Sequence, residues 1–209
     1  MSVLEDKFLK EGVRLPVMEA FYTIQGEGYH TGLASFFVRI GGCDVGCHWC
    51  DVKESWNPEI HPLINVEDVL KNALQYPAKT LVITGGEPSS FNLKKLTQIF
   101  KYKGYNIHIE TSGAYSLNGH FDWVCLSPKK TSPPQKTILE KANELKVIIY
   151  NNDDFKWAEK YKNQVNTNHL YLQPEWSKRA VMLPKIIDYV KAHPEWKISL
   201  QTHKYMNIP

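Results

Sequence analysis

The sequence has few cysteines, little excess charge and no long apolar run. Only four of its 209 residues are cysteine, too few for the disulfide framework of a small secreted domain. No apolar run approaches the roughly 20 residues that a membrane span needs, and residues 1–10 lack the apolar core of a signal peptide. The formal net charge of +3 is too small to indicate nucleic-acid binding. We therefore expect a soluble, cytoplasmic protein without nucleic-acid or membrane partners.

What the sequence does have is enough apolar residues for one sizeable core. They make up 43% of the chain, and we predict a single domain over residues 1–209. Strand-like runs are expected at residues 17–24, 35–40, 80–84, 105–110, 123–126, 146–150, 170–173 and 197–201. Helix-like runs are expected at residues 66–75, 93–102, 155–161 and 179–193. This alternation is typical of a parallel sheet with crossover helices, and roughly six such units predict a compact partial barrel of the (β/α)6 type.

Three cysteines form the most informative pattern. Cys43, Cys47 and Cys50 are spaced C-x3-C-x2-C in a short, glycine-rich segment. Soft thiolates at such spacing favour iron–sulfur clusters or zinc. A structural zinc site is normally closed by four ligands, whereas three leave one metal position open. Because no fourth cysteine or suitably placed histidine is present, we favour a cluster with one open iron, which can bind and reduce a small molecule. Cys125 lies in an apolar strand and reads as a small buried hydrophobe.

Polar, glycine- and proline-bearing segments follow several of the expected strands. They are residues 84–88, 110–113, 127–129 and 173–175. In a barrel, the ends of the strands and the loops just after them gather at one face, where ligands bind. Turn residues are common at any single strand end, but their repeated occurrence together with the cysteines predicts one shared cofactor pocket.

The cysteine motif, followed by Gly85-Gly86-Glu87-Pro88 after a buried strand, resembles the radical S-adenosylmethionine (SAM) superfamily. The resemblance implies a modified partial barrel in which Cys43, Cys47 and Cys50 hold a [4Fe-4S] cluster. It also implies that the fourth iron binds the amino and carboxylate groups of SAM, whose reductive cleavage gives a 5′-deoxyadenosyl radical. Without Cβ atoms, the two glycines would allow a close approach to the methionine end of SAM.

More specific motifs narrow the resemblance. Residues 21–28, Arg39 and the tail at 201–209 are similar to the 7-carboxy-7-deazaguanine synthase family, over residues 17–209. The resemblance implies that 6-carboxy-5,6,7,8-tetrahydropterin is converted to 7-carboxy-7-deazaguanine with loss of ammonia, on the route to queuosine or another 7-deazapurine. It also implies a lyase that regenerates SAM, takes electrons from flavodoxin or ferredoxin, and forms a homodimer.

The resemblance also assigns residues to ligands. Those assigned to the pterin are Ile24, Gln25, Gly26, Arg39, Thr84, His203 and Pro209. Those assigned to SAM are Trp49, Cys50, Asp51, Gly86, Glu110, Ser127, Pro128, Lys129, Gln173, Pro174, Glu175 and Trp176. The Arg39 guanidinium would pair with the substrate carboxylate, and its place at the end of an apolar strand disfavours a surface ion pair. Glu110 could equally well cap a strand end.

Two further features concern the tail and a metal. In the family that the chain resembles, the main-chain carboxylate of a final proline accepts two N–H groups of the pterin, and here Pro209 is in that position. Many members also have Thr or Ser after the Cys-Asp pair, and its hydroxyl binds Mg²⁺. Here the residue is Val52, whose side chain cannot bind a hard cation. Mg²⁺ is therefore either held by substrate oxygens, water and Asp51, or dispensable.

Two other functions share parts of this pattern. A glycyl-radical-enzyme activating protein also has the three cysteines and the glycine turn, but it needs an open groove for a polypeptide. Arg39 and a terminal carboxylate suit a small ring better. An electron-transfer iron–sulfur protein would need a fully ligated cluster, and a fourth ligand is missing. The sequence leaves open the electron donor, the dimer surface and the final deazapurine.

Overall fold

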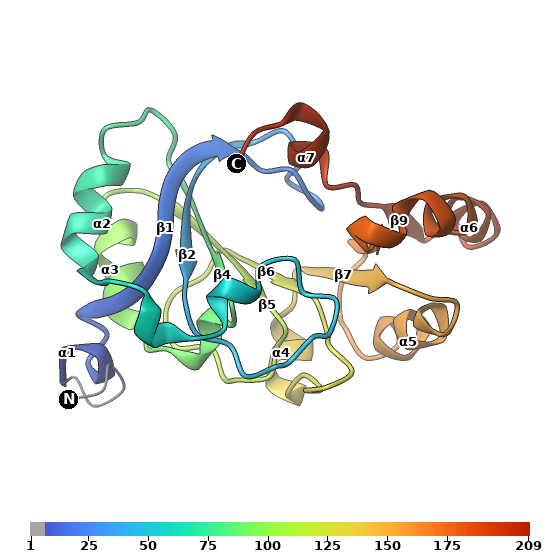
Figure 1. The fold of residues 1–209 in the computed structure, drawn as a ribbon, viewed down its shortest axis with the longest axis horizontal. Helices are drawn as coiled ribbons and strands as arrows, with labels where there is room; N and C mark the ends of the chain where they lie inside the picture. Colours follow the sequence, from blue (N-terminus) through green and yellow to red (C-terminus); the bar gives the residue numbers. More distant parts are fainter. Residues whose placement is uncertain (1–6) are drawn as a thin grey trace.

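Residues 7–209 are described here by a computed structural model (Figure 1). The strands are β1 (Arg14–Ile24), β2 (Ala34–Ile40), β3 (Leu63–Asn65), β4 (Thr80–Gly85), β5 (Asn106–Thr111), β6 (Trp123–Leu126), β7 (Glu144–Ile149), β8 (Leu170–Pro174) and β9 (Trp196–Ile198). The helices are α1 (Lys7–Lys10), α2 (Val66–Ala73), α3 (Lys94–Tyr102), α4 (Lys136–Lys141), α5 (Asp153–Lys162), α6 (Arg179–Ala192) and α7 (Thr202–Met206). The first six residues, where no signal peptide is expected, lie outside the described part.

All nine strands join one sheet in the order β3-β1-β2-β4-β5-β6-β7-β8-β9. β2 and β4 to β9 pair in parallel, whereas β1 is antiparallel to both β2 and β3. Because the order begins at β3 and ends at β9, the sheet is not closed, and the predicted partial barrel is confirmed. Among residues 7–209, no helix is long and apolar enough to cross a membrane.

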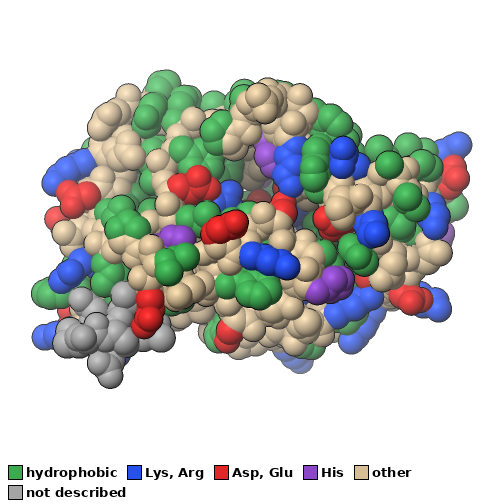
Figure 2. Space-filling view, viewed as in Figure 1, with side chains coloured by type: hydrophobic (Ala, Val, Ile, Leu, Met, Phe, Trp, Pro, Cys, Tyr) green, Lys and Arg blue, Asp and Glu red, His purple; other side chains and the backbone are tan. Residues whose placement is uncertain are grey.

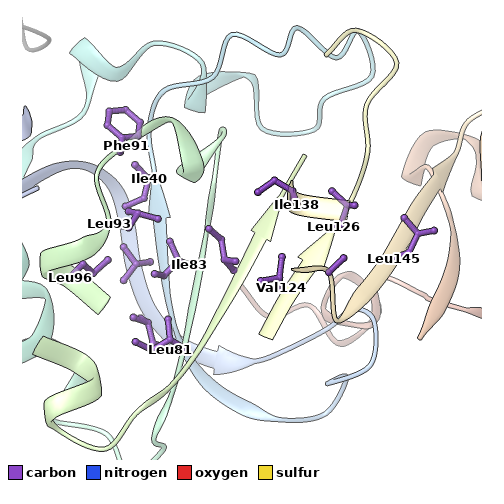
Figure 3. Close-up of a cluster of buried hydrophobic side chains, with 14 of the residues drawn as sticks. Ile40, Leu81, Ile83, Phe91, Leu93, Leu96, Val124, Leu126, Ile138 and Leu145 are labelled. Atoms are coloured by element: carbon purple, nitrogen blue, oxygen red, sulfur yellow. The ribbon is translucent and has the colours of Figure 1, made fainter. Parts of the chain in front are cut away.

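The outer face of the sheet carries the hydrophobic core. Successive side chains of a strand point to opposite faces, and one set in each parallel strand is apolar and packs beneath the helices (Figure 3). On β2, β4, β6 and β7 this set includes Ile40, Ile83, Leu126 and Leu145. α3 packs on β5, α4 on β6, α5 on β7, and α6 on β8 and β9. Removing this apolar surface from water is the main driving force for the layered arrangement.

The inner face carries charged and polar residues as well as apolar ones, because part of it lines a cavity. The inward positions alternate with the apolar ones and include Arg39, Thr84, Glu110, Lys146 and Gln173. These residues lie on β2, β4, β5, β7 and β8, toward the carboxyl ends of the strands. The parallel sheet therefore gathers charged groups from distant parts of the sequence at one end.

Several short elements differ from the sequence prediction. The predicted strand at residues 197–201 was wrong at its end, because β9 stops at Ile198 and the chain turns away toward α7. β3, α4 and α7 were not predicted, since three to six residues are too few to show a periodicity. The crossover from β5 to β6 contains no helix. Cys125 is buried, as expected.

The tail after β9 returns to the first strand. The amide of Thr202 donates to the carbonyl of Gly26 at 2.9 Å, and the hydroxyl of Thr23 donates to the carbonyl of Pro209 at 3.3 Å. Figure 1 shows α7 and the C-terminus beside the end of β1. The last residues thus cover the inner face of the partial barrel at its carboxyl end.

Candidate functional site

A cavity of about 420 Å³ opens at the carboxyl ends of the parallel strands. In Figure 2 the surface is hollowed beneath the C-terminal segment. Residues with predicted roles that line it are Ile24, Gln25, Gly26, Arg39, Cys43, Cys47, Trp49, Cys50, Asp51, Thr84, Gly86, Glu110, Ser127, Lys129, Gln173, Pro174, Glu175, Trp176, His203 and Pro209. Pro128 is the exception: it lines a smaller adjoining cavity of about 130 Å³ with Cys47 and Trp49. The structure thus brings nearly all of the predicted residues together, while their individual roles stay predictions.

The three cysteines lie on an irregular segment between β2 and β3. This segment is fixed by its backbone: the amide of Gly42 donates to the carbonyl of Ser55 at 2.6 Å, and that of Cys43 to Trp56 at 3.0 Å. The three thiols are partly exposed and line the cavity. Burial raises the pKa of the Cys43 and Cys47 thiols, so binding to iron must displace their protons.

Gly85 and Gly86 allow the cysteine segment to pack against the end of β4. A Cβ on Gly85, whose φ is +146°, would lie 2.1 Å from the carbonyl oxygen of Ile40. A Cβ on Gly86 would lie 2.4 Å from the carbonyl oxygen of Gly42 and 2.7 Å from the Cβ of Cys43. Besides the expected room for SAM, the two glycines are therefore needed for close packing within the chain around the cysteines.

The Glu87 carboxylate joins the ends of β4 and β5. It is buried and accepts hydrogen bonds from the hydroxyls of Ser89 and Thr111, both at 2.6 Å, and from the amide of Ser112 at 2.7 Å. The amide of Glu87 donates to the carbonyl of Gly42 at 2.9 Å. Because a buried charge needs such partners, Glu87 fixes the two strand ends and the cysteine segment in one arrangement.

An ion-paired lysine forms the floor of the cavity. The ammonium of Lys146, which is 4% exposed, lies 2.6 Å from Glu27 Oε2 and 2.8 Å from Glu110 Oε2. Gln201 and Gln25 donate to the other oxygens of these carboxylates, at 2.9 and 3.3 Å. Burial opposes the charged form of Glu27, but Lys146 outweighs it and lowers the pKa to about 2. Burial also opposes the charge on Lys146, yet the surrounding anionic groups raise its pKa.

Sequence reasoning missed Lys146 and Glu27 as site residues. The available signal was the pair of charged residues, Glu144 and Lys146, in an otherwise apolar strand. Such alternation indicates a strand with one polar face, but the partners of Lys146 lie 119 and 36 residues away. Their proximity could not be read from local sequence.

Arg39 lines the cavity but also makes the ion pair that its position had disfavoured. Its Nε donates to Glu19, which lies directly opposite on β1. Beside this pair, the rings of Phe21 and Phe37 stack with centroids 5.5 Å apart. The expectation that Arg39 is free of a surface ion pair was therefore wrong, because the antiparallel register brings Glu19 beside it.

The wall formed by β6 and β8 combines cations with indole rings. Lys129 donates to the carbonyl of Ser127 at 2.7 Å and lies 5.6 Å from the ring centroid of Trp49. Burial lowers the pKa of Lys129. Glu175 accepts hydrogen bonds from the amides of Ser177 and Lys178, at 3.0 and 3.1 Å. Its carboxylate thus caps the short helix after β8, a role that the sequence did not reveal.

The tail contributes two adjacent side chains to the cavity. His203 packs so closely on Gly26 that a Cβ there would lie 2.3 Å from its Nδ1. Burial lowers the pKa of His203. Lys204 Nζ lies 2.6 Å from Asp51 Oδ2 and 5.0 Å from the ring centroid of Trp176. The tail therefore touches both the β1 end and the wall that was assigned to SAM.

The residues present fit an iron–sulfur cluster and SAM. Three thiols, which are soft ligands, line the cavity together with Gly86, whose backbone packs directly against Cys43. Mg²⁺ fits poorly. Val52 presents an apolar side chain, and Asp51 is already paired with Lys204.

Comparisons with known proteins agree with this geometry. The model of the Radical SAM superfamily matches residues 37–122. A 7-carboxy-7-deazaguanine synthase of Flavobacterium psychrophilum is 57% identical over 202 residues, 96% of each chain. One from a Synechocystis species is 46% identical over 94% of each chain. The crystal structure of QueE from Escherichia coli matches with a TM-score of 0.79 and 29% identity, over 94% of this chain and 97% of that one.

Proposed function

Because this chain belongs to the 7-carboxy-7-deazaguanine synthases, within the radical SAM superfamily, we propose that it converts 6-carboxy-5,6,7,8-tetrahydropterin to 7-carboxy-7-deazaguanine with release of ammonia. It is an enzyme of the radical SAM lyase kind. One observation carries the proposal: a single cavity brings together the three thiols, the cation of Arg39 and the tail that includes His203 and Pro209.

The cofactor would be held by the side chains already described. Cys43, Cys47 and Cys50 would hold a [4Fe-4S] cluster, and the Gly86 segment would face SAM. When bound, these groups supply a carbon radical that removes a hydrogen atom from the substrate. The protein's own task is positioning, since a reactive radical attacks whatever lies close.

The substrate-binding residues follow from charge and hydrogen bonding. A guanidinium suits a carboxylate, so Arg39 would bind the 6-carboxylate of the substrate. The same guanidinium also pairs with Glu19. Glu27 and Glu110 would accept N–H groups of the ring, and Lys146 forms an ion pair with each of the two carboxylates in the floor of the cavity. The aromatic pair of Phe21 and Phe37 would shield one side of the ring from water.

Finer parts of the proposal rest on the family. We propose that residues 1–209 form one domain, that the enzyme works in the cytoplasm as a homodimer, and that flavodoxin or ferredoxin supplies its electrons. The product would serve queuosine or another 7-deazapurine. We propose no nucleic-acid or membrane partner, consistent with a net charge of only +3.

The test is reconstitution. The protein is loaded anaerobically with iron and sulfide, then incubated with the carboxypterin, SAM and dithionite. We expect the deazapurine, identified by its mass, and no methionine beyond a small uncoupled fraction. A Cys47→Ala variant, which loses one thiol, should form none. A wild-type enzyme that cleaves SAM but leaves the pterin unchanged would contradict the proposal, and would favour an activating protein that acts on a polypeptide.

A further inference from the structure

We propose that the ammonium of Lys204 takes the place of a divalent cation beside Asp51, so that this enzyme binds its substrate without Mg²⁺. The inference rests on the proposed function, since it concerns the binding of a carboxylated pterin. Its basis is the oxygen atoms of the two residues that follow Cys50. The side chain of Val52 has no oxygen, and its carbonyl and the Asp51 carboxylate already have partners in the chain.

Val52 offers no oxygen to a cation. Its side chain lines the cavity and is purely apolar. Its carbonyl accepts two hydrogen bonds, from the amide of Ser55 at 3.1 Å and from the hydroxyl of Ser55 at 2.6 Å. Both lone pairs of the carbonyl are therefore used. Mg²⁺ requires near-octahedral coordination by oxygen and releases its waters reluctantly. With no side-chain oxygen and an occupied carbonyl, Val52 gives the ion no local anchor.

The Asp51 carboxylate is already neutralised. Lys204 Nζ lies 2.6 Å from its Oδ2. A divalent cation at Asp51 would have to displace a cation that the chain itself provides.

Lys204 is held in place from several sides. Its ammonium lies 5.0 Å from the ring centroid of Trp176, whose other neighbours include Arg179 at 4.0 Å and Tyr205. The side chain is 23% exposed, compared with 50% for Asp51. An exposed ion pair contributes little by itself, but this lysine also lines the cavity and is covalently fixed beside His203. Its charge is therefore present whenever the tail is in place.

The placement gives Lys204 a positioning role. It lies on the tail, which is assigned to the pterin, while both of its partners lie on the side assigned to SAM. A cation that joins these two sides attracts a carboxylate and holds the tail closed, as a bound metal ion would. Unlike a metal ion, its contribution does not depend on Mg²⁺ concentration.

The experiment measures pterin binding rather than turnover. Holoenzyme with SAM is titrated anaerobically with 6-carboxypterin, a non-reducing analogue, by fluorescence quenching in EDTA and in excess Mg²⁺. The variants are Lys204→Met, Val52→Thr/Lys204→Met and Lys191→Met, the last a matched control on the exposed face of α6. Wild-type affinity should change less than about twofold with Mg²⁺. Lys204→Met should bind about tenfold more weakly in EDTA, and the double variant should recover in Mg²⁺.

The outcomes separate this inference from the proposed function. Wild-type binding that tightens fivefold or more with Mg²⁺ would overturn the inference and leave the function standing. So would a Lys204→Met variant that binds as the Lys191→Met control does. No binding by the wild type in either buffer would overturn both. Thermal unfolding checks that Lys204→Met is folded, and Lys204→Arg, which keeps the charge, should retain binding and Mg²⁺ independence.

Discussion

The two ends of the partial barrel use the same strands in opposite ways. At the carboxyl end, Glu110 of β5 and Lys146 of β7 face each other as an ion pair. Two residues earlier on the same faces, His108 and Glu144 lie toward the amino end, where neither side chain forms an ion pair with a described residue. Burial there raises the pKa of Glu144 to about 7 and lowers that of His108 to about 4. One end thus carries an ion pair, whereas the pKa shifts at the other end favour the neutral forms of Glu144 and His108.

The amino end is sealed by a loop. Tyr29 and His30 pack with Trp123 and His169, and the ring centroids of His30 and Trp123 are 4.5 Å apart. Among the described residues, His30 Nε2, His169 Nδ1 and Glu144 Oε1 are buried without a hydrogen-bond partner. The same loop places Gln25 and Glu27 in the cavity. One loop thus provides both the aromatic cluster at the amino end, through Tyr29 and His30, and polar groups of the cavity, through Gln25 and Glu27.

Removing the floor cation should have the largest effect. Lys146→Met leaves the half-buried carboxylates of Glu27 and Glu110 without their shared cation, and breaking a buried pair costs about 3–5 kcal/mol. We expect a large loss of unfolding free energy, measured by urea denaturation, and no product detectable by mass spectrometry. Lys197→Met, on β9 and exposed, is the control. A variant as stable as this control would show that the floor does not depend on its charge pairing.

Obstructing the cysteine segment should come next. In Gly86→Ala the new Cβ would lie 2.4 Å from the carbonyl oxygen of Gly42, and such overpacking costs about 1–3 kcal/mol. We expect much less iron and sulfide per chain after reconstitution. Gly32→Ala is the comparison, because it carries backbone strain at φ +94° but meets no atom within 4 Å. Equal iron content in both variants would contradict the packing role.

At the amino end, Glu144 should give a pH-dependent stability. Its folded pKa is raised from 4.5 to about 7, so its contribution is fully present below pH 4.5 and is lost as the pH rises toward 7. The loss amounts to about 3 kcal/mol at most. Glu144→Gln should remove this loss, as measured by urea unfolding at pH 5 and pH 8.

His108 provides the internal control for that experiment. Its pKa is lowered from 6.5 to about 4, so its contribution is present above pH 6.5 and is lost as the pH falls toward 4. Glu144→Gln should leave this acid-side loss unchanged. If the variant and the wild type have parallel pH profiles between pH 5 and pH 8, Glu144 does not titrate in that range.

The smallest effect is expected at the rim of the cavity. Glu19 competes with a substrate carboxylate for Arg39, but the pair is partly exposed, and such pairs contribute about 0–1 kcal/mol. Glu19→Gln should therefore tighten the binding of 6-carboxypterin by about twofold to fivefold. Weaker binding would mean that Glu19 orients Arg39 rather than competing for it.

Local sequence was sufficient for elements with a one-sided pattern. β6 was predicted with both of its ends, and the amphipathic α2 was predicted from its first residue. β7 was predicted two residues too late, because Glu144 and Lys146 break the apolar run. A barrel whose inner face lines a cavity carries polar residues in its strands, and a single strand cannot reveal what faces it.

The site was predictable where its residues are contiguous. The cysteines and the segment 84–88 each form a short contiguous motif. The resemblance to a known family was therefore enough to predict that both line one cavity. The partners of Lys146 and Arg39, and the contact of Lys204 with Asp51 across 153 residues, depend on how the strands are ordered. Strand order is a long-range property, and no local pattern specifies it.

The unclosed sheet has a mechanical consequence. Where β9 and β1 do not pair, the two sides are joined by isolated hydrogen bonds, such as that from Thr202 to Gly26 and that from the amide of Gly28 to the hydroxyl of Ser199 at 2.9 Å. These isolated hydrogen bonds can break without disrupting the hydrogen bonds between paired strands, so local opening should start there. The weakest connection between the two sides of the sheet therefore lies beside the cavity, at Gly26 and Gly28.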